Sequence, residues 1–186
     1  MQDDSGAVTR FALALYRSSN VSPACLTLQD RLDVDVNLVL YAAFVGAVRA
    51  QILTEAHLNS ARGVVDEWHR EVVQPLRSVR RRLKTGPSPA PSPATMELRR
   101  ELQRLEIKAE VVELAELDAV AAEHDGPHAG DDASARATAA ITVVALSISG
   151  RTPAELDAEI LEAVAVIATA AAELANDPPA GERDSR

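Results

Sequence analysis

The sequence has few of the residues that stabilise disulfide-linked or aromatic-rich folds. Only one of its 186 residues is cysteine, and aromatic residues make up 3% of the chain. One cysteine excludes an internal disulfide and any metal site built from several cysteines. Alanine accounts for 34 residues, so alanine, leucine and valine must supply most of the core. This composition favours closely packed helices over an aromatic-rich sheet.

Long apolar runs are also missing. The longest purely apolar stretch, residues 38–48, has 11 residues, whereas a helix that spans a bilayer needs about 20. The first ten residues are acidic and show no basic segment followed by an apolar one, so no secretory signal is predicted. We therefore expect a cytoplasmic protein with no membrane span.

The negative charge is concentrated in the second half of the chain. The net charge is −9, made up of +2 in residues 1–95 (11 basic, 9 acidic) and −11 in residues 96–186 (8 basic, 19 acidic). A chain this acidic repels nucleic acid on average, so general nucleic-acid binding is not expected.

Hydrophobic periodicity and capping residues predict helices along the whole chain, with no convincing strand pattern. The fold class is therefore all-α, a compact bundle of about six helices. The predicted helix over residues 36–53 is apolar on nearly every side, so the other helices should enclose it. A helix over residues 54–84 must be kinked or interrupted at Pro75, because proline lacks the amide donor and clashes with the preceding turn.

The expected domain organisation follows from shifts in composition. The predicted segments are a frayed N-terminus (1–7), a helical core (8–84), a Pro/Ser linker (85–95), a second helical half packing on the core (96–175) and a disordered tail (176–186). The second half opens with an apolar stripe spaced 4, 3, 4 and 3 residues apart: Leu98, Leu102, Leu105, Ala109 and Val112. Two heptads are too few for an independent coiled coil, so packing of the stripe into the domain is favoured over a dimer seam.

One candidate site lies near Asp30, Asn37, Trp68 and His69. Histidine can act as an acid, a base or a ligand near neutral pH. Neighbouring residues on a helix point about 100° apart, so Trp68 can enter the core while His69 lies at its edge. A buried Asn37 needs a hydrogen-bond partner, such as a chain-end carbonyl or the Asp30 carboxylate. These residues suggest a small-ligand or enzymatic pocket, although no complete catalytic set is present.

The second candidate is a basic ridge formed by Arg77, Arg80, Arg81, Arg82 and Lys84. Such a ridge can bind an anion. Pairing within the chain or between subunits is favoured over a phosphate or nucleic-acid contact. The expected carboxylate partners are Glu106, Glu110 and Glu113.

Other chemistry-bearing residues are better explained by structural roles. The acidic residues Asp33 and Asp35 fit helix capping more simply than magnesium binding, and Cys25 fits a small buried side chain. The His- and Asp-rich loop 124–132 fits a solvated connection. No metal site and no cofactor are predicted.

Four segments carry a resemblance to a known family. They are ACLTLQD (24–30), DVNLVLYAAF (35–44), WHREVVQPLRSVRRRLK (68–84) and LRRELQRLEIKAEVVEL (98–114). Together they resemble a proteobacterial family of mostly helical proteins of unknown function. The resemblance implies one helical domain in a bacterial, intracellular setting, and it supplies no catalytic residue.

The favoured hypothesis for function is a protein-interaction or assembly protein. Its binding surface would combine the 77–84 ridge with the helix over 96–123, and its partner would be another protein or a second copy. The alternatives are the pocket described above and an anion or nucleic-acid contact by the ridge.

Overall fold

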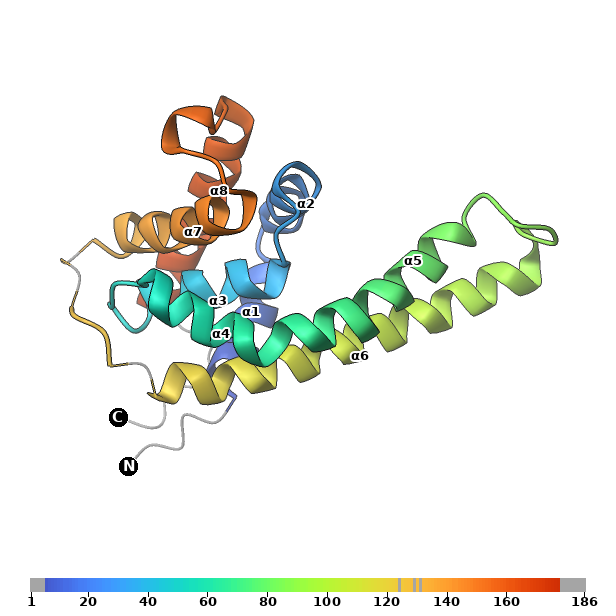
Figure 1. Cartoon of the computed structure of the whole chain (residues 1–186), viewed down its shortest axis with the longest axis horizontal. Coiled ribbons are helices and arrows are strands. Elements are labelled where there is room, and N and C mark those ends of the chain that lie inside the picture. Colours follow the sequence, from blue (N-terminus) through green and yellow to red (C-terminus); the bar gives the residue numbers. More distant parts are fainter. Residues whose placement is uncertain (1–5, 124, 129, 131, 178–186) are drawn as a thin grey trace.

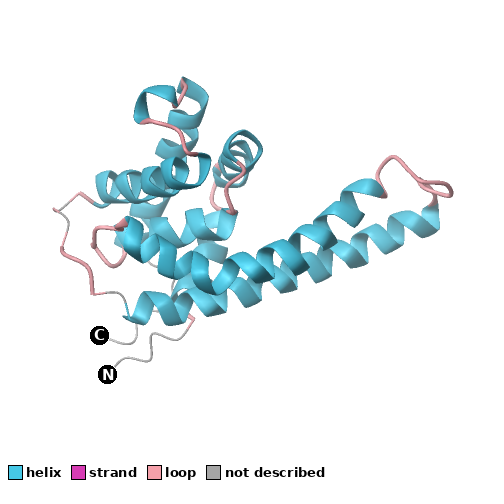
Figure 2. Ribbon diagram, viewed as in Figure 1, coloured by secondary structure: helices cyan, strands magenta, loops and turns pink. Residues whose placement is uncertain are grey.

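The computed structural model describes residues 6–123, 125–128, 130 and 132–177, and helices are the regular elements of this part (Figure 2). The all-α prediction is therefore confirmed. The elements are α1 (Ala7–Arg17), α2 (Val21–Leu32), α3 (Val36–Ala47), α4 (Glu55–Trp68), a π-helical turn η1 (His69–Val73), α5 (Gln74–Arg82), α6 (Pro93–Glu123), α7 (Ala133–Ser149), a 3-10 turn η2 (Pro153–Glu155) and α8 (Ala158–Asn176).

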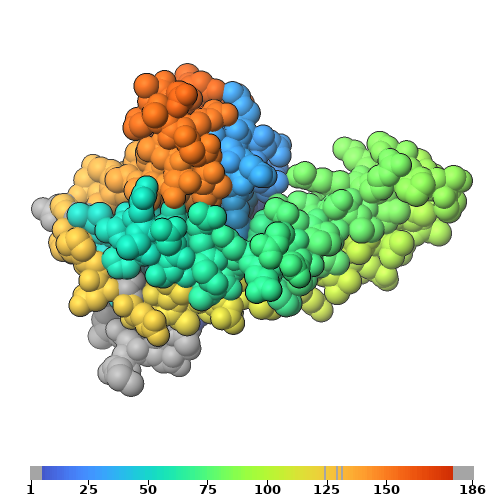
Figure 3. Space-filling model, in the orientation of Figure 1, coloured from blue at the N-terminus to red at the C-terminus, as the bar shows by residue number. Residues whose placement is uncertain are grey.

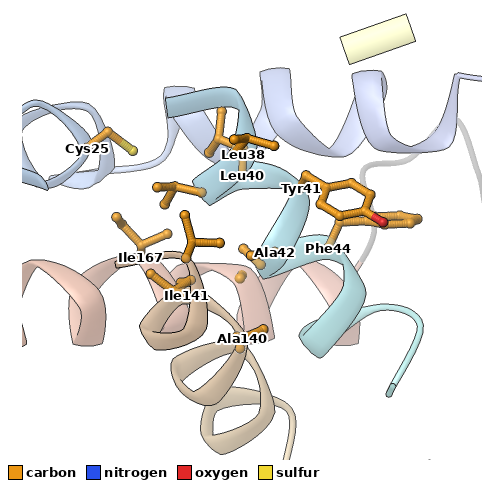
Figure 4. Close-up of a cluster of buried hydrophobic side chains, with 14 of the residues drawn as sticks. Cys25, Leu38, Leu40, Tyr41, Ala42, Phe44, Ala140, Ile141 and Ile167 are labelled. Atoms are coloured by element: carbon orange, nitrogen blue, oxygen red, sulfur yellow. The ribbon is translucent and has the colours of Figure 1, made fainter. Parts of the chain in front are cut away.

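Helix α3 is the centre of the fold, as its apolar sequence predicts. Every residue from Asn37 to Ala47 is buried, and α1, α6, α7 and α8 all pack against it. Figure 4 shows Leu40 and Ala42 of α3 close to Ile141 of α7 and Ile167 of α8. Each large aliphatic side chain that is fully buried contributes about 1.5–3 kcal/mol to folding, so the burial of α3 contributes strongly to stability.

Helix α3 is shorter than the predicted range of 36–53. It ends at Ala47 because Arg136 of α7 occupies its last carbonyls: Nε donates to the Gly46 carbonyl at 2.8 Å and a terminal nitrogen donates to that of Ala47 at 3.4 Å. The chain then turns at Ala50, whose φ is +54°. A side chain from a distant helix thus replaces the next helical amides.

The predicted helix over 54–84 is a run of α4, η1 and α5. Its N-terminus is capped by Thr54, which accepts a hydrogen bond from the amide of His57. The interruption expected at Pro75 is present, as a π-helical turn that ends just before it. Such turns insert one extra residue into a helix and are frequent at functional sites.

Helix α5 and the first half of α6 form a hairpin that projects from the other helices (Figure 1). We call residues 74–108 the arm. The Pro/Ser segment, predicted to be a linker over residues 85–95, forms the turn at its tip, and α6 already begins at Pro93. The remaining helices form the body.

The last two helices of the chain, α7 and α8, both pack against α3. Helix α7 ends at Ser149 and is followed by Gly150, whose φ is +66°. The final helix begins at Ala158, where Asp157 caps it by accepting from the amide of Ile160 at 3.1 Å. Residues 1–5 of the predicted frayed terminus and 178–186 of the predicted tail lie outside the described residues.

No helix in the described residues combines the length and the apolar character that a membrane span requires.

Candidate functional site

Three ionisable side chains from distant parts of the sequence meet at the base of the arm. His69 Nδ1 lies 3.0 Å from Glu113 Oε1 and 3.3 Å from Asp35 Oδ2. The Glu113 side chain is completely buried, and those of Asp35 and His69 are only 11% and 13% exposed. We call these three residues the acid–histidine cluster.

Asn37 positions both carboxylates of this cluster. Its backbone amide donates to Asp35 Oδ1 at 2.8 Å, so that Asp35 caps α3 as predicted. Its side-chain amide donates to Glu113 Oε2 at 2.5 Å and to the Glu110 carbonyl at 3.2 Å. Asn37 therefore has the partners that its burial requires, and the carboxylate is that of Glu113 and not the suggested Asp30.

Burial and mutual attraction shift the titration of the cluster. Burial raises the pKa of Asp35 to about 7, although His69 opposes the shift, while Glu113 adds to it. Burial alone would lower the pKa of His69, but the carboxylates of Glu113 and Asp35 outweigh it and raise that pKa above its ordinary value. His69 thus lies between two acidic side chains.

Trp68 and His69 lie on the α6 side of the helical run. The Trp68 indole donates to the Ala109 carbonyl at 3.1 Å, and its side chain is 39% exposed. The prediction that Trp68 enters the core is therefore wrong, because its N–H bonds to the backbone of α6 and leaves the ring at the surface. His69 lies at the core edge, as expected.

Asp30 does not join the other three predicted pocket residues. It is largely exposed and lies 4.0 Å from Arg81. It borders a groove of about 660 Å³ between α2 and the arm, visible as a hollow in Figure 3. His69 lines the same groove, together with Arg77 and Arg82. The groove therefore connects Asp30 to the acid–histidine cluster only through His69.

Part of the basic ridge pairs with α6, as predicted. Arg77 donates to Glu106 at 2.8 Å and to Glu110 at 2.6 Å, and Arg80 donates to Glu106. Burial alone would raise the pKa of Glu106, but the guanidinium groups of Arg80 and Arg77 hold it below its ordinary value. The third expected acceptor, Glu113, contacts His69.

The outer part of the ridge is solvent-exposed. Among the described residues, Arg81 forms an ion pair with the exposed Asp30 alone, at 4.0 Å. Within the described part of the chain, Arg82 and Lys84 make no ion pair. They are the ridge residues that remain available to an anionic surface.

Two further candidates agree with structural roles where they are described. Cys25 is buried, and burial raises its pKa to about 12, so its thiol is not reactive. In the 124–132 loop, Asp132 caps α7 by accepting from the amide of Ser134 at 2.9 Å. His124 and Asp131 lie outside the described residues.

A family model described as a protein of unknown function, DUF2390, matches residues 8–117. The chain belongs to this family. The matched range contains the whole arm and all three residues of the acid–histidine cluster. Searches of curated proteins and of solved structures each gave no significant match. The family match confirms the resemblance as far as a family of unknown function.

In this DUF2390 member, sequence reasoning missed Asp35 and Glu113 as parts of one site. Asp35 was explained by its cap, and Glu113 was assigned to the basic ridge. The available signal was the spacing on α6, where Glu106 and Glu113 are seven residues apart and flank the buried Ala109. Charged residues on a buried helical face need specific partners.

Proposed function

We propose that this protein is an assembly protein that pairs with a second copy of itself through the arm. The observation that carries the proposal is an apolar stripe on α6 that the body does not cover. Leu98, Leu105 and Val112 are spaced by seven residues, share one helical face and are 44–50% exposed. Of the other two residues of the predicted stripe, Ala109 is buried and Leu102 is partly buried, so the stripe packs into the domain only in part.

An exposed apolar face on a projecting hairpin of two helices favours a binding partner that covers it. Apolar patches on a monomer's surface mark interaction sites when they are contiguous. Trp68 is also exposed, and its indole bonds to the carbonyl of Ala109, which lies between Leu105 and Val112 in the sequence of α6. A second helix laid along the stripe would cover all these side chains.

The charge distribution favours a second copy as the occupant. Residues 74–108 contain nine Lys or Arg and three Glu, a net charge of +6, while the rest of the chain carries −15. Residues 109–123 of α6 contain five acidic and no basic residues, of which Glu116 and Glu123 are exposed. Two antiparallel copies of α6 would therefore place each basic arm against the acidic half of the other helix.

A two-fold axis at Leu105 satisfies the apolar pattern. In an isologous pair the same patch is used by both subunits. Leu105 would then face its own counterpart, and Leu98 would face Val112 of the second copy, because both are seven residues from the axis. This arrangement makes the proposal specific in register.

The other two hypotheses have less support. An anion or nucleic-acid contact by the ridge would rely on Arg77 and Arg80, whose charges are already paired with Glu106 and Glu110. The pocket hypothesis lacks Asp30, which is separate from Asn37 and Trp68. The bacterial and cytoplasmic setting remains part of our proposal.

Sedimentation equilibrium of the wild type and of two matched variants tests the dimer. Leu105→Glu puts two carboxylates at the axis, whereas Ile107→Glu changes a side chain of equal exposure on the opposite face of α6. We expect a dimer for the wild type and for Ile107→Glu, and a dissociation constant at least about 10-fold higher for Leu105→Glu, equivalent to about 1.4 kcal/mol.

The register and the electrostatics have separate tests. Leu105→Cys should form a disulfide between two copies under mild oxidation, and Cys25 should not interfere because it is buried. The dimer should weaken as salt rises, since exposed charges are screened beyond about 10 Å at 0.1 M salt. A wild type that is monomeric at every salt and protein concentration would refute the proposal, as would equal dimerisation of the two Glu variants.

A further inference from the structure

We infer that the acid–histidine cluster of Asp35, His69 and Glu113 is a binding site for one divalent transition-metal ion, with Zn²⁺ as the best match. This inference is independent of dimerisation through the arm. It rests on the geometry of three side chains that come from the N-terminus of α3, from the π-helical turn and from the buried face of α6.

Within the three-residue cluster, His69 Nδ1 supplies one N–H for the two buried carboxylate oxygens that face it. The Nδ1–H of His69 is directed at Glu113 Oε1. Asp35 Oδ2 is also buried and has no hydrogen-bond partner. A buried carboxylate oxygen without a hydrogen-bond partner is costly. A divalent cation, bound by neutral His69, would balance both acids.

The hydrogen bonds from Asn37 orient the remaining oxygen of each carboxylate toward His69 Nδ1. Asn37 bonds to Asp35 Oδ1 through its backbone amide and to Glu113 Oε2 through its side chain. Each carboxylate is thus held by one oxygen, and its other oxygen faces His69 Nδ1. Outer hydrogen bonds of this kind are typical of metal sites, where they fix the orientation of the ligands.

The distances between the three atoms suit a metal. Zn²⁺ binds nitrogen and carboxylate oxygen at about 2.0–2.2 Å, which places neighbouring ligands of a tetrahedral site about 3.3 Å apart. The observed separations from His69 Nδ1 are 3.0 and 3.3 Å, and all three atoms lie within 4.8 Å of one another. Closing the third edge, between the carboxylate oxygens of Asp35 and Glu113, from at most 4.8 Å to about 3.3 Å would complete one face of the coordination sphere.

The site also has a route for the ion and room for a further ligand. His69 lines the groove of about 660 Å³ between α2 and the arm, whereas Glu113 lies in the interior. Three protein ligands with one open position are typical of zinc sites that bind water or an exchangeable ligand. The groove side of His69 is where that position would lie.

The ligand types exclude several competing ions. Mg²⁺ and Ca²⁺ prefer oxygen ligands alone, and Cu⁺ prefers thiolates and thioethers. One imidazole with two carboxylates suits Zn²⁺ and also the first-row ions Mn²⁺ and Fe²⁺. We commit to Zn²⁺ because its four-coordinate geometry needs only three protein ligands.

Isothermal titration of the chelator-stripped full chain with ZnCl₂ tests the site, with MgCl₂ as the comparison ion. We expect one Zn²⁺ per chain and no comparable Mg²⁺ binding. His69→Gln and Glu113→Gln should abolish the event. Asn37→Ser should weaken it by about 10–100-fold, as outer-sphere changes usually do.

The controls separate the site from surface histidines and from unfolding. His57→Gln and His128→Gln should retain full binding, because these histidines lie outside the cluster. Circular dichroism checks that each variant is folded, and Co²⁺ added to the wild type reports coordination by its visible absorption if a variant does not fold. No stoichiometric Zn²⁺ binding by the wild type, or unchanged binding by folded His69→Gln, would overturn the inference.

Discussion

Replacing Gly46 with alanine should destabilise the protein, although alanine is the better helix former. A Cβ atom at Gly46 would lie 2.7 Å from the carbonyl carbon and oxygen of Arg136 and 2.8 Å from Cα of Ala137, whereas ordinary contacts begin at 3.4 Å. These are backbone atoms of α7, so no side-chain rotation relieves the clash. Helices α3 and α7 must separate by about 0.7 Å at this point, in a close-packed interior.

The expected cost follows from opposing terms. Overpacking a core costs about 1–3 kcal/mol, and the rigid backbone contacts place Gly46→Ala at the upper end. The gain in helix propensity is about 1 kcal/mol. The net loss in the free energy of unfolding should be about 2 kcal/mol, measured by urea denaturation followed by circular dichroism.

Gly63 provides the matched control. It lies in α4, is exposed, and has no atom within 4 Å of the position of an added Cβ. Gly63→Ala should therefore stabilise the protein by about 0.5–1 kcal/mol. The reasoning about the contact between α3 and α7 is wrong if Gly46→Ala is as stable as the wild type or shifts in the same direction as Gly63→Ala.

Two further changes test the ion pairs and the long-range cap. Because the pKa of Glu106 is lowered in the folded state, its carboxylate stabilises the fold above the ordinary value of 4.5, and this contribution is lost as pH falls through the folded pKa. Glu106→Gln should cost about 1–3 kcal/mol at pH 7, and melting temperatures should show that its difference from the wild type shrinks below pH 4.5. Asp118 accepts from the amide of Val8 at 2.6 Å and from the hydroxyl of Thr9 at 2.7 Å, so Asp118→Ala should cost about 1–3 kcal/mol and speed hydrogen exchange in α1. An unchanged exchange rate in α1 would contradict this role.

The sequence predicted those elements whose signals are local. Asp35 caps α3, the helical run predicted from residue 54 begins there, and the interruption lies next to Pro75. The enclosure of α3 followed from its apolar character on all sides. In each case the residues that decide the structure lie within a few positions of the feature.

Features set by distant residues could not be predicted in this way. The N-terminus of α1 is capped by Asp118, 110 residues away, and α3 is stopped by Arg136, 90 residues away. Periodicity gives the face of a helix but not the element that covers it, so the exposure of Leu105 was also missed. Such contacts depend on the tertiary arrangement, which local propensity does not encode.

The acid–histidine cluster is the clearest example of this limit. Asp35, His69 and Glu113 each had a simple local explanation, as a cap, a boundary residue and a ridge partner. Their common role appears only when α3, the π-helical turn and α6 are brought together. No pair among them lies within 30 residues in the sequence, so no spacing motif points to the site.

The stability of the body and the geometry of the cluster are physically linked through α3. The family match ends at residue 117 in α6, whereas α7 and α8, which begin after it, supply much of the surface against α3. Asp35 is the cap of α3, so its carboxylate is fixed only while that helix is packed.

Gly46→Ala perturbs the far end of the same helix. If the variant remains folded, its Zn²⁺ affinity should match that of the wild type, because the clash lies three turns from Asp35. A general loosening of α3 would instead lower stability and metal affinity together, whereas loss of a ligand would lower affinity alone.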